Sequence, residues 1–277
     1  SNGLPAEPLP KVSVVTPSFN QGNFLEQTIL SVLGQDYPNL QYIIMDGGST
    51  DGSVEIIKKY AGQLDHWESG PDGGQADAIA KGFKISNGEI LAWLNSDDVY
   101  LPDTVSKIVS AAQKHQATDL FYGDAWIIDE HGFQIGGRKL TQLDQYDFLG
   151  QGNSLAQPAS FWRRSIYDQV GGINPDFYFQ MDLDFYIRVA LQGRIKYISG
   201  YLAKVRMHAD GKMTKAEDIR QSDLVKLQDR HMPSKKFERL RYNKLFLQAR
   251  LFLRYLMQGD VRYLAARIWA RLIPGSA

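Results

Sequence analysis

The four residues Asn95-Ser96-Asp97-Asp98 have the strongest potential for chemistry, because they follow the apolar run Ile90–Leu94, which predicts a buried strand. Two adjacent carboxylates repel each other, so Asp97 and Asp98 need a compensating cation or full solvation. Oxygen ligands at a strand end suit Mg²⁺ or Mn²⁺, which bridge protein carboxylates to substrate phosphates. The alternative is a solvated acidic turn in which Asp98 caps a helix at Pro102. The motif alone leaves both interpretations open.

A second polar turn, Asp46–Gly52, follows the predicted strand 41–45. Two consecutive glycines, Gly47 and Gly48, let the backbone approach a ligand closely. The Asp46 carboxylate can accept a hydrogen bond from the imide of a nucleobase. A plain loop between a strand and a helix has the same composition, and by itself this turn favours the loop.

Two further candidates lie later in the chain. Asp182 and Asp184 stand at the start of a predicted helix, where a carboxylate can act as a general base or simply cap the helix and interact with its dipole. His208 can complete a metal shell, and Arg206 or Lys212 can bind phosphate. A single histidine in a loop is more often a surface residue, so these residues need a structural context before they carry a function.

The elements that must position these residues alternate between strands and helices. The predicted strands are 12–16, 41–45, 66–68 and 90–94, and helical patterns follow at 25–33, at 54–60 with Thr50 or Asp51 as its cap, and after Gly74 to about 86. Such alternation predicts right-handed crossovers and a mostly parallel sheet, which binds its ligands at the carboxyl ends of its strands. Further on, 120–122 and 125–128 read as two strands, 182–191 as a helix with Phe185, Val189 and Leu191 partly inward, and the chain from 216 as almost entirely helical.

Composition narrows the class of protein. With 43% hydrophobic and 22% charged residues the 277-residue chain is typical of a globular protein, and the absence of cysteine excludes disulfides and zinc–thiolate sites. The formal net charge is zero, but residues 231–277 hold ten Lys and Arg against Glu238 and Asp260, a net charge of +8. No apolar stretch reaches about 20 residues, so we expect no transmembrane helix, and residues 1–10 do not resemble a signal peptide. We therefore expect a cytoplasmic protein.

The basic C-terminal region has two interpretations. The apolar residues of this region are more than one narrow helical stripe requires: Phe246, Leu247, Leu251, Phe252, Leu253, Tyr255 and Leu256. Arg250 and Arg254 are four residues apart. The region can lie on the anionic inner face of a membrane, where lipid-linked acceptors reside. Packing against the catalytic domain or a homodimer mate accounts for the same pattern equally well. Nucleic-acid binding is not expected, because the region has no known nucleic-acid-binding motif.

Taken together, the motifs resemble those of the family-2 glycosyltransferases, nucleotide-sugar enzymes with the GT-A fold. Any one motif is weak, but six in the family's order are specific. These are Val12–Asn20, Asp46–Ser53, Leu94–Asp98, Gly171–Asn174, Asp182–Asp184 and Arg206–His208.

The resemblance implies an α/β fold of the GT-A type, with a mostly parallel sheet flanked by helices in residues 11–212. An N-terminal extension, 1–10, precedes this domain, and a helical basic region, 213–277, follows it. The resemblance also implies an inverting, metal-dependent enzyme that moves a sugar from a nucleoside diphosphate, most simply UDP, to a hydroxyl acceptor. The acceptor would be a glycan, a lipid-linked sugar or a related molecule in polysaccharide, cell-surface glycan or glycolipid synthesis.

The resemblance also implies roles for individual residues. The donor site would contain Thr16, Pro17, Asn20, Asp46, Asp72, Asp77, Lys81, Asn95, Ser96 and Asp97. Mn²⁺ or Mg²⁺ would be bound by Asp97, Asp98 and His208, and Asp182 falls at the position of the family's catalytic base. Acceptor contacts would come from the variable loop 138–158.

Two departures from the family pattern affect the metal and the base. The metal motif begins with Asn95 in place of an aspartate, and Met181 replaces the glutamate before the catalytic aspartate. They leave open a nucleotide-sugar-binding subunit without turnover. A nucleotidyltransferase or a dinucleotide-dependent enzyme is disfavoured, because no glycine-rich phosphate loop follows the first strand.

Overall fold

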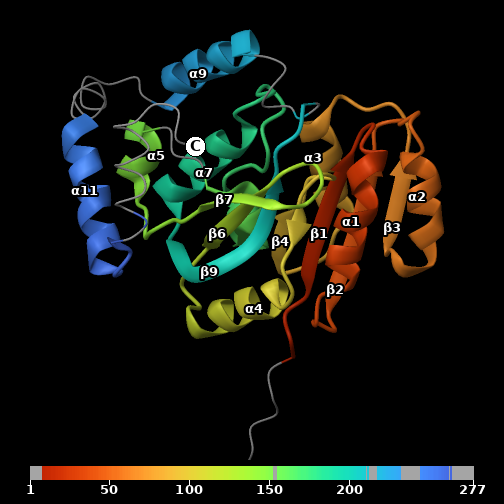
Figure 1. Ribbon diagram of the computed structural model, residues 1–277, viewed down its shortest axis with the longest axis horizontal. Helices are drawn as coiled ribbons and strands as arrows, with labels where there is room; N and C mark the ends of the chain where they lie inside the picture. Colours follow the sequence, from red (N-terminus) through yellow and green to blue (C-terminus); the bar gives the residue numbers. More distant parts are fainter. Residues whose placement is uncertain are drawn as a thin grey trace, which may run out of the picture.

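A computed structural model describes residues 8–151, 155–209, 211, 217–231, 244–261 and 263. Figure 1 shows its helices and strands. The strands are β1 (Val12–Ser18), β2 (Leu40–Asp46), β3 (His66–Ser69), β4 (Ile90–Trp93), β5 (Val99–Tyr100), β6 (Leu120–Ile128), β7 (Gln134–Arg138), β8 (Ser160–Arg163) and β9 (Ile195–Arg206). The helices are α1 (Gly22–Leu33), α2 (Ser53–Tyr60), α3 (Gln75–Ile85), α4 (Thr104–Lys114), α5 (Gln145–Gln151), α6 (Arg164–Gln169), α7 (Met181–Gln192), α9 (Glu217–His231) and α11 (Lys244–Met257), with short 3₁₀ turns η1 (Ala61–Gln63) and η2 (Gln157–Ala159).

The strands form one sheet in the order β3-β2-β1-β4-β8-β6-β9-β5, and β7 pairs with β6 at its far end. The first four strands in this order are parallel. The second half is mixed, since β8 runs antiparallel to both β4 and β6. This confirms the predicted α/β class with a mostly parallel sheet flanked by helices.

Buried hydrophobic residues explain why the first half folds as it does. Every residue of β1 is buried, as a central parallel strand requires. Helix α3 packs closely on this strand because residue 82 is glycine, and a Cβ there would lie 2.4 Å from a methyl carbon of Val15. The close approach fixes α3, and with it the residues at its first turn, relative to the carboxyl end of β1.

Local details differ from the sequence prediction. The two short strands predicted at 120–122 and 125–128 are one strand, β6, whose pairing with β9 shifts register on either side of Asp124 instead of stopping there. Helix α2 has Gly52 at its N-cap, with φ of 95°, so neither Thr50 nor Asp51 occupies that position. Leu191 is 44% exposed instead of partly inward. The predicted variable loop 138–158 contains α5 and η2.

The C-terminal helices are in contact with the sheet domain. Helix α11 lies beside α5 (Figure 1), and its Leu251 and Tyr255 are buried. Arg254 donates to Asp144 at 2.9 Å and to Asp147 at 2.5 Å. Of the predicted roles of this region, the structure therefore supports packing of α11 against the sheet domain.

The remaining predictions for the C-terminal region are only partly covered. Phe252, Leu253, Leu256 and Met257 are exposed on α11, and membrane or dimer contact through them stays a prediction. Many of the basic residues counted in the tail, such as Lys235 and Arg267, lie outside the described residues. Across the described part of the chain, no helix combines the length and the apolar character needed to cross a bilayer.

Removing the Arg254 guanidinium is expected to destabilise the protein, because the Asp147 carboxylate is fully buried and loses its charged partner. Arg254→Met is expected to lower the free energy of unfolding by about 3 kcal/mol, which chemical denaturation can measure. Asp147→Asn combined with Arg254→Met is expected to recover part of that loss. The exposed Gln248→Ala serves as the control on the same helix. Equal stability of Arg254→Met and wild type would contradict the contact.

A second stability prediction concerns Asp124 on β6. Burial raises the pKa of its carboxyl from 3.8 to about 6, although the Leu140 amide and the Tyr197 hydroxyl both donate to it. The fold therefore favours the protonated form. The stability that this preference provides is complete below about pH 4 and is lost as the pH rises through about 6.

Asp124→Asn keeps an acceptor for Leu140 but does not titrate. The free energy of unfolding of wild type, relative to this variant, is expected to fall by about 2 to 3 kcal/mol between pH 4 and pH 8. Denaturation of both proteins over that range measures the difference. Parallel pH profiles would contradict the assignment.

Candidate active site

Three of the predicted polar turns meet at one edge of the sheet. β1 lies between β2 and β4 and is parallel to both, so the carboxyl ends of the three strands are neighbours. The segments that follow them are Phe19–Gln21, Gly47–Gly52 and Leu94–Asp98. The parallel register therefore brings together residues that are far apart in the sequence, as a sheet of this class predicts.

Asp97 and His208 form the most specific pair at this edge. His208 Nε2 lies 3.1 Å from Asp97 Oδ2. The imidazole is 3% exposed and its ring packs on Phe24 with ring centroids 4.5 Å apart. A carboxylate oxygen and an imidazole nitrogen directed at one point suit a divalent cation that takes its other ligands from phosphate and water. No cluster of three or more acidic or histidine ligands is present in the described ranges.

Asp98 has a structural role in this site. Its Oδ1 accepts the Arg206 amide at 3.0 Å and its Oδ2 accepts the Asn95 side chain at 3.2 Å. Burial, and then the charge of Asp97, raise the pKa of Asp98 well above its usual range. The alternative in which Asp98 caps the next helix is wrong, because α4 begins at Thr104. In this geometry Asp98 joins the metal motif to β9, and Asp97 is the carboxylate directed at His208.

The Arg206 guanidinium is already engaged. It donates to Asp97 O at 2.9 Å, to the Asp129 and Glu130 carbonyls at 3.1 and 3.2 Å, and to Gln27 Oε1 at 2.7 Å. It also lies 4.8 Å from the centroid of the Phe24 ring. We therefore correct the suggestion that Arg206 binds phosphate, since these contacts use its donors to hold the Asp97 turn. Lys212, the other basic candidate, lies outside the described residues.

Asn95 also bridges elements. Its Oδ1 accepts from Gln75, at the first turn of α3, at 2.8 Å, while its amide donates to Asp98. Ser96 is 5% exposed beside it. A neutral amide can accept on one side and donate on the other, which an aspartate at position 95 cannot do. Asn95, which replaces the family's aspartate, thus links the first turn of α3 to the Asp98 carboxylate.

Asp46 organises the loop after β2. Its Oδ2 accepts from the Gly48 and Ser49 amides and from Ser69 Oγ, and its Oδ1 accepts from Ser49 Oγ. The residue is 3% exposed. Asn20, with φ of 52°, ties the neighbouring loop to it, because its Oδ1 accepts the Thr50 amide at 2.9 Å. The Asp46 carboxylate therefore shapes the binding edge by holding the backbone of the loop at Gly48 and Ser49.

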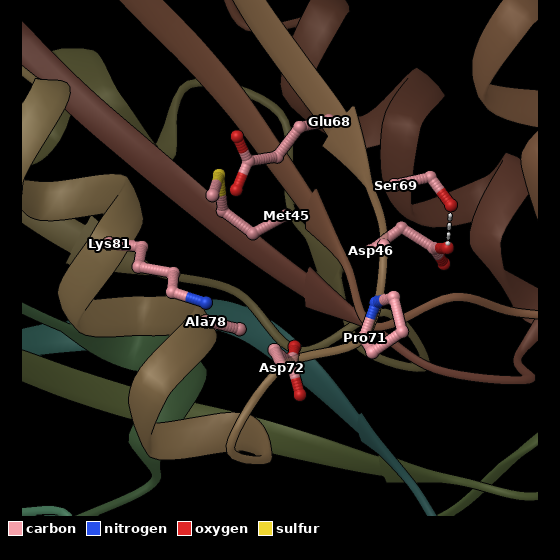
Figure 2. Close-up of a pocket in the computed structure, with 9 residues that line it drawn as sticks. Met45, Asp46, Glu68, Ser69, Pro71, Asp72, Ala78 and Lys81 are labelled. Carbon is pink, nitrogen blue, oxygen red and sulfur yellow. Dashed lines mark hydrogen bonds between the residues drawn. The ribbon is translucent and has the colours of Figure 1, made fainter.

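A pocket of about 260 Å³ lies between the ends of β2 and β3 and the helix α3. Figure 2 shows the Lys81 amine and the Glu68 and Asp72 carboxylates around it, and the hydrogen bond between Asp46 and Ser69 at one side. Thr16 and Pro17 do not line it. Thr16 is fully buried and its hydroxyl lies 3.1 Å from that of Tyr42, so its expected place in the base pocket needs correction.

Asp72, Asp77 and Lys81 hold the other side of the pocket. Asp72 Oδ1 accepts the Gly74 amide at 2.7 Å, and a Cβ on Gly47 would lie only 3.1 Å from Asp72 Oδ2. Asp77 pairs with Lys81 at 2.8 Å and does not line the pocket itself. The hydrogen bond from Lys81 lowers the pKa of Asp77, and the same contact raises the pKa of Lys81. Asp77 thus orients the one cationic side chain of the pocket.

Asp182 lies in the first turn of α7, at the same edge of the sheet. Strand β6 runs in the same direction as β4, because both are antiparallel to β8. Asp119 precedes β6 and so lies at the amino edge of the sheet, where it accepts the Arg194 amide at 2.7 Å. The C-terminal end of α7 is therefore at the amino edge. Phe185, on the Asp182 face of the helix, lies 6.5 Å from Trp93 between ring centroids. The helix therefore directs its first turn towards the turn that follows β4.

Sequence reasoning did not name several residues of this site individually. Gln75, Ser69 and Phe24 contact Asn95, Asp46 and His208 only after folding, and no local pattern distinguishes them from ordinary polar or core residues. The second departure, Met181, is 5% exposed and packs in the core.

Comparison with known proteins agrees with this arrangement. The family model described as Glycosyl transferase family 2 matches residues 13–171. An uncharacterized glycosyltransferase of Mycobacterium tuberculosis (strain H37Rv) is 32% identical over 193 residues, which are 66% of this chain and 70% of that protein. The PGL/p-HBAD biosynthesis glycosyltransferase of Mycobacterium bovis (strain BCG / Pasteur 1173P2) is 29% identical over 185 residues, 65% of this chain and 69% of that protein.

Solved structures share the fold at low sequence identity. S. aureus TarS 1-349 in complex with UDP-GlcNAc has a TM-score of 0.62 at 17% identity, covering 85% of this chain and 71% of that one. The mannosyltransferase PcManGT from Pyrobaculum calidifontis, in complex with GDP-Man and Mn2+, has a TM-score of 0.60 at 17% identity, covering 97% and 76%. An alignment with a second TarS 1-349 structure spans 60% of that chain. With its GT-A fold and its family match over more than half of its length, this chain belongs to glycosyltransferase family 2.

Proposed function

We propose that this glycosyltransferase uses a divalent cation to bind a nucleoside diphosphate sugar and transfers the sugar, with inversion, to an acceptor hydroxyl. The observation that carries the proposal is the Asp97–His208 pair, 3.1 Å apart, at the edge of the sheet where the first turn of α7 presents Asp182. One ligand set and one carboxylate then stand at the same edge. Inverting transfer needs both a stabilised leaving group and a base.

The pair fits a metal chemically. Asp97 would supply an oxygen ligand to the cation and His208 a nitrogen ligand. An imidazole ligand favours Mn²⁺ over Mg²⁺, which prefers oxygen ligands. When bound, the cation neutralises charge on the departing diphosphate. The protein's part is to hold Asp97, and it does so through the contacts of Arg206 with the Asp97 carbonyl.

The base is proposed to be Asp182. Its Oδ1 accepts the Leu183 amide at 2.7 Å, and the positive end of the helix dipole favours a carboxylate in the first turn. The carboxylate takes the proton from the acceptor hydroxyl as that oxygen attacks the anomeric carbon. The C–O bond to the diphosphate breaks on the opposite face, so the configuration inverts.

The pocket favours a nucleobase that presents a carbonyl beside an imino N–H. The Lys81 ammonium can donate to the carbonyl, and the Asp72 or Glu68 carboxylate can accept the N–H. Uracil and guanine have this pattern, whereas adenine does not. We propose UDP as the donor nucleotide, with GDP as the second candidate because PcManGT was solved with GDP-Man.

A ligand screen tests the proposal. Calorimetry with UDP, GDP and ADP, each with Mn²⁺, Mg²⁺ or EDTA, is expected to give tightest binding for UDP with Mn²⁺ and no measurable binding for ADP. Release of UDP from UDP-hexoses and UDP-N-acetylhexosamines then identifies the sugar. A preference for GDP would change the proposed nucleobase from uracil to guanine, and failure of every nucleoside diphosphate to bind would overturn the proposal.

A further inference from the structure

Helix α9 presents one face to the start of α7. One face of α9 carries Asp223, Leu227, Arg230 and His231, which follow helical spacing. On this face Leu227 is buried, and the other three side chains contact α7 or the segment before it. Val225 is exposed, as is Asp229 on the opposite side. Figure 1 shows α9 above α7 at the end of the sheet towards which β1 runs. Both helices lie beyond residue 171, where the family match ends.

Asp223 binds the backbone directly before α7. Its carboxylate is 1% exposed, and Oδ2 accepts the Phe179 amide at 2.6 Å and the Gln180 amide at 3.3 Å. Gln180 is the N-cap residue of α7, and its own side chain makes no capping hydrogen bond. The donors at a helix start need partners, and here a carboxylate from another helix supplies one.

His231 holds the next part of the same turn. Its Nε2 lies 2.7 Å from Asp184 Oδ1, and Arg188 binds the other oxygen of Asp184 at 2.7 Å. Burial alone would raise the pKa of Asp184, but the His231 hydrogen bond and the Arg188 charge lower it below its usual value. Asp184 is fully buried, so α9 and α7 are joined by a compensated charge inside the protein.

The two contacts lie behind Asp182. In a helix with 3.6 residues per turn, Asp182 and Asp184 point about 160° apart. Asp184 faces α9, whereas Asp182 shares its face with Phe185 and Tyr186. The ring centroids of Phe185 and Trp93 are 6.5 Å apart, and the Tyr186 hydroxyl oxygen lies 2.6 Å from Ser160 Oγ. Helix α9 thus holds the back of the turn whose front carries Asp182.

We propose that Asp223 and His231 are positioning residues that fix the first turn of α7 and so direct Asp182 at the acceptor hydroxyl. The proposal rests on the function proposed above, in which Asp182 is the base. It assigns to α9 a part in catalysis through α7, with no contact of its own to the substrate.

The test is steady-state kinetics of the full chain with the donor that the ligand screen identifies. Asp223→Ala is expected to lower kcat by about 10- to 100-fold, because a small misplacement of a catalytic group is costly. KM for the donor is expected to stay within about twofold, since the donor pocket lies on β2, β3 and α3. Asp223→Asn retains an acceptor for the Phe179 amide and is expected to recover most of kcat. Asp229→Ala on the exposed side of α9 is the matched control.

A double-mutant cycle separates positioning from general destabilisation. In the Asp182→Asn background, Asp223→Ala is expected to lower kcat by less than about threefold, because the group that it positions is already inactive. The same loss in both backgrounds, a raised donor KM, or full activity of Asp223→Ala would each overturn the proposal. If wild type transfers no sugar, or Asp182→Asn is fully active, the proposed function itself fails, and this outcome is distinct from the others.

Discussion

Asp182→Asn is expected to lower kcat by about 10²- to 10⁴-fold while the affinity for the nucleoside diphosphate stays unchanged. The amide keeps the size of the side chain and an acceptor for the Leu183 amide, but it cannot take a proton from the acceptor hydroxyl. Steady-state turnover together with calorimetric titration of UDP and Mn²⁺ measures the two quantities separately.

The exposed Glu55→Gln on α2 is a suitable control, because it removes a surface carboxylate that does not line the pocket. It is expected to retain wild-type turnover. Normal turnover of Asp182→Asn would show that the proton goes to another group. A loss of UDP affinity in that variant would place Asp182 in the donor site instead.

Asp97→Ala is expected to abolish the contribution of Mn²⁺ to UDP binding. Wild type should bind UDP more tightly with Mn²⁺ than with EDTA, whereas the variant should show the same weak affinity in both. We expect at least about a 100-fold weaker Kd than wild type in Mn²⁺, since even outer residues of metal sites change affinity by about 10- to 100-fold.

His208→Ala is the matched variant for the second ligand. It removes the imidazole that lies 3.1 Å from Asp97 and is expected to weaken Mn²⁺-assisted binding more than Mg²⁺-assisted binding, because the lost ligand is a nitrogen. Unchanged UDP affinity of Asp97→Ala with Mn²⁺ present would remove the metal from the proposal and leave the nucleotide pocket as its only support.

The elements of the first half could be predicted because their signals are local. Apolar runs that end near Pro17 or at Asn95, and the helical spacing between them, depend only on neighbouring residues. The family's motif order then predicted the fold. The boundaries between elements were less predictable, as β6 shows, because its pairing with β9 resumes at Asp124 after a shift of register, where the sequence predicted two separate strands.

The roles of individual polar residues were harder to predict. Asp98, Arg206 and Asp46 have the residue types of a metal ligand, a phosphate ligand and a base contact. In the fold Arg206 donates to backbone carbonyls of two distant segments, Asp98 accepts the Arg206 amide, and Asp46 accepts amides of its own loop and a hydroxyl at the end of β3. Such contacts depend on which loops meet at the end of the sheet, which is information that composition and spacing do not contain.

The sequence by itself determined the family, the class of fold, and the identity of the acidic and histidine side chains available for chemistry. Only the tertiary structure decided which of them converge. It directs Asp97 at His208, uses Asp98 and Arg206 as supports, and attaches Asp223 from a C-terminal helix to the start of α7. The physical reason is that helix and strand signals act over a few residues, whereas a site is made by contacts between segments up to 179 residues apart.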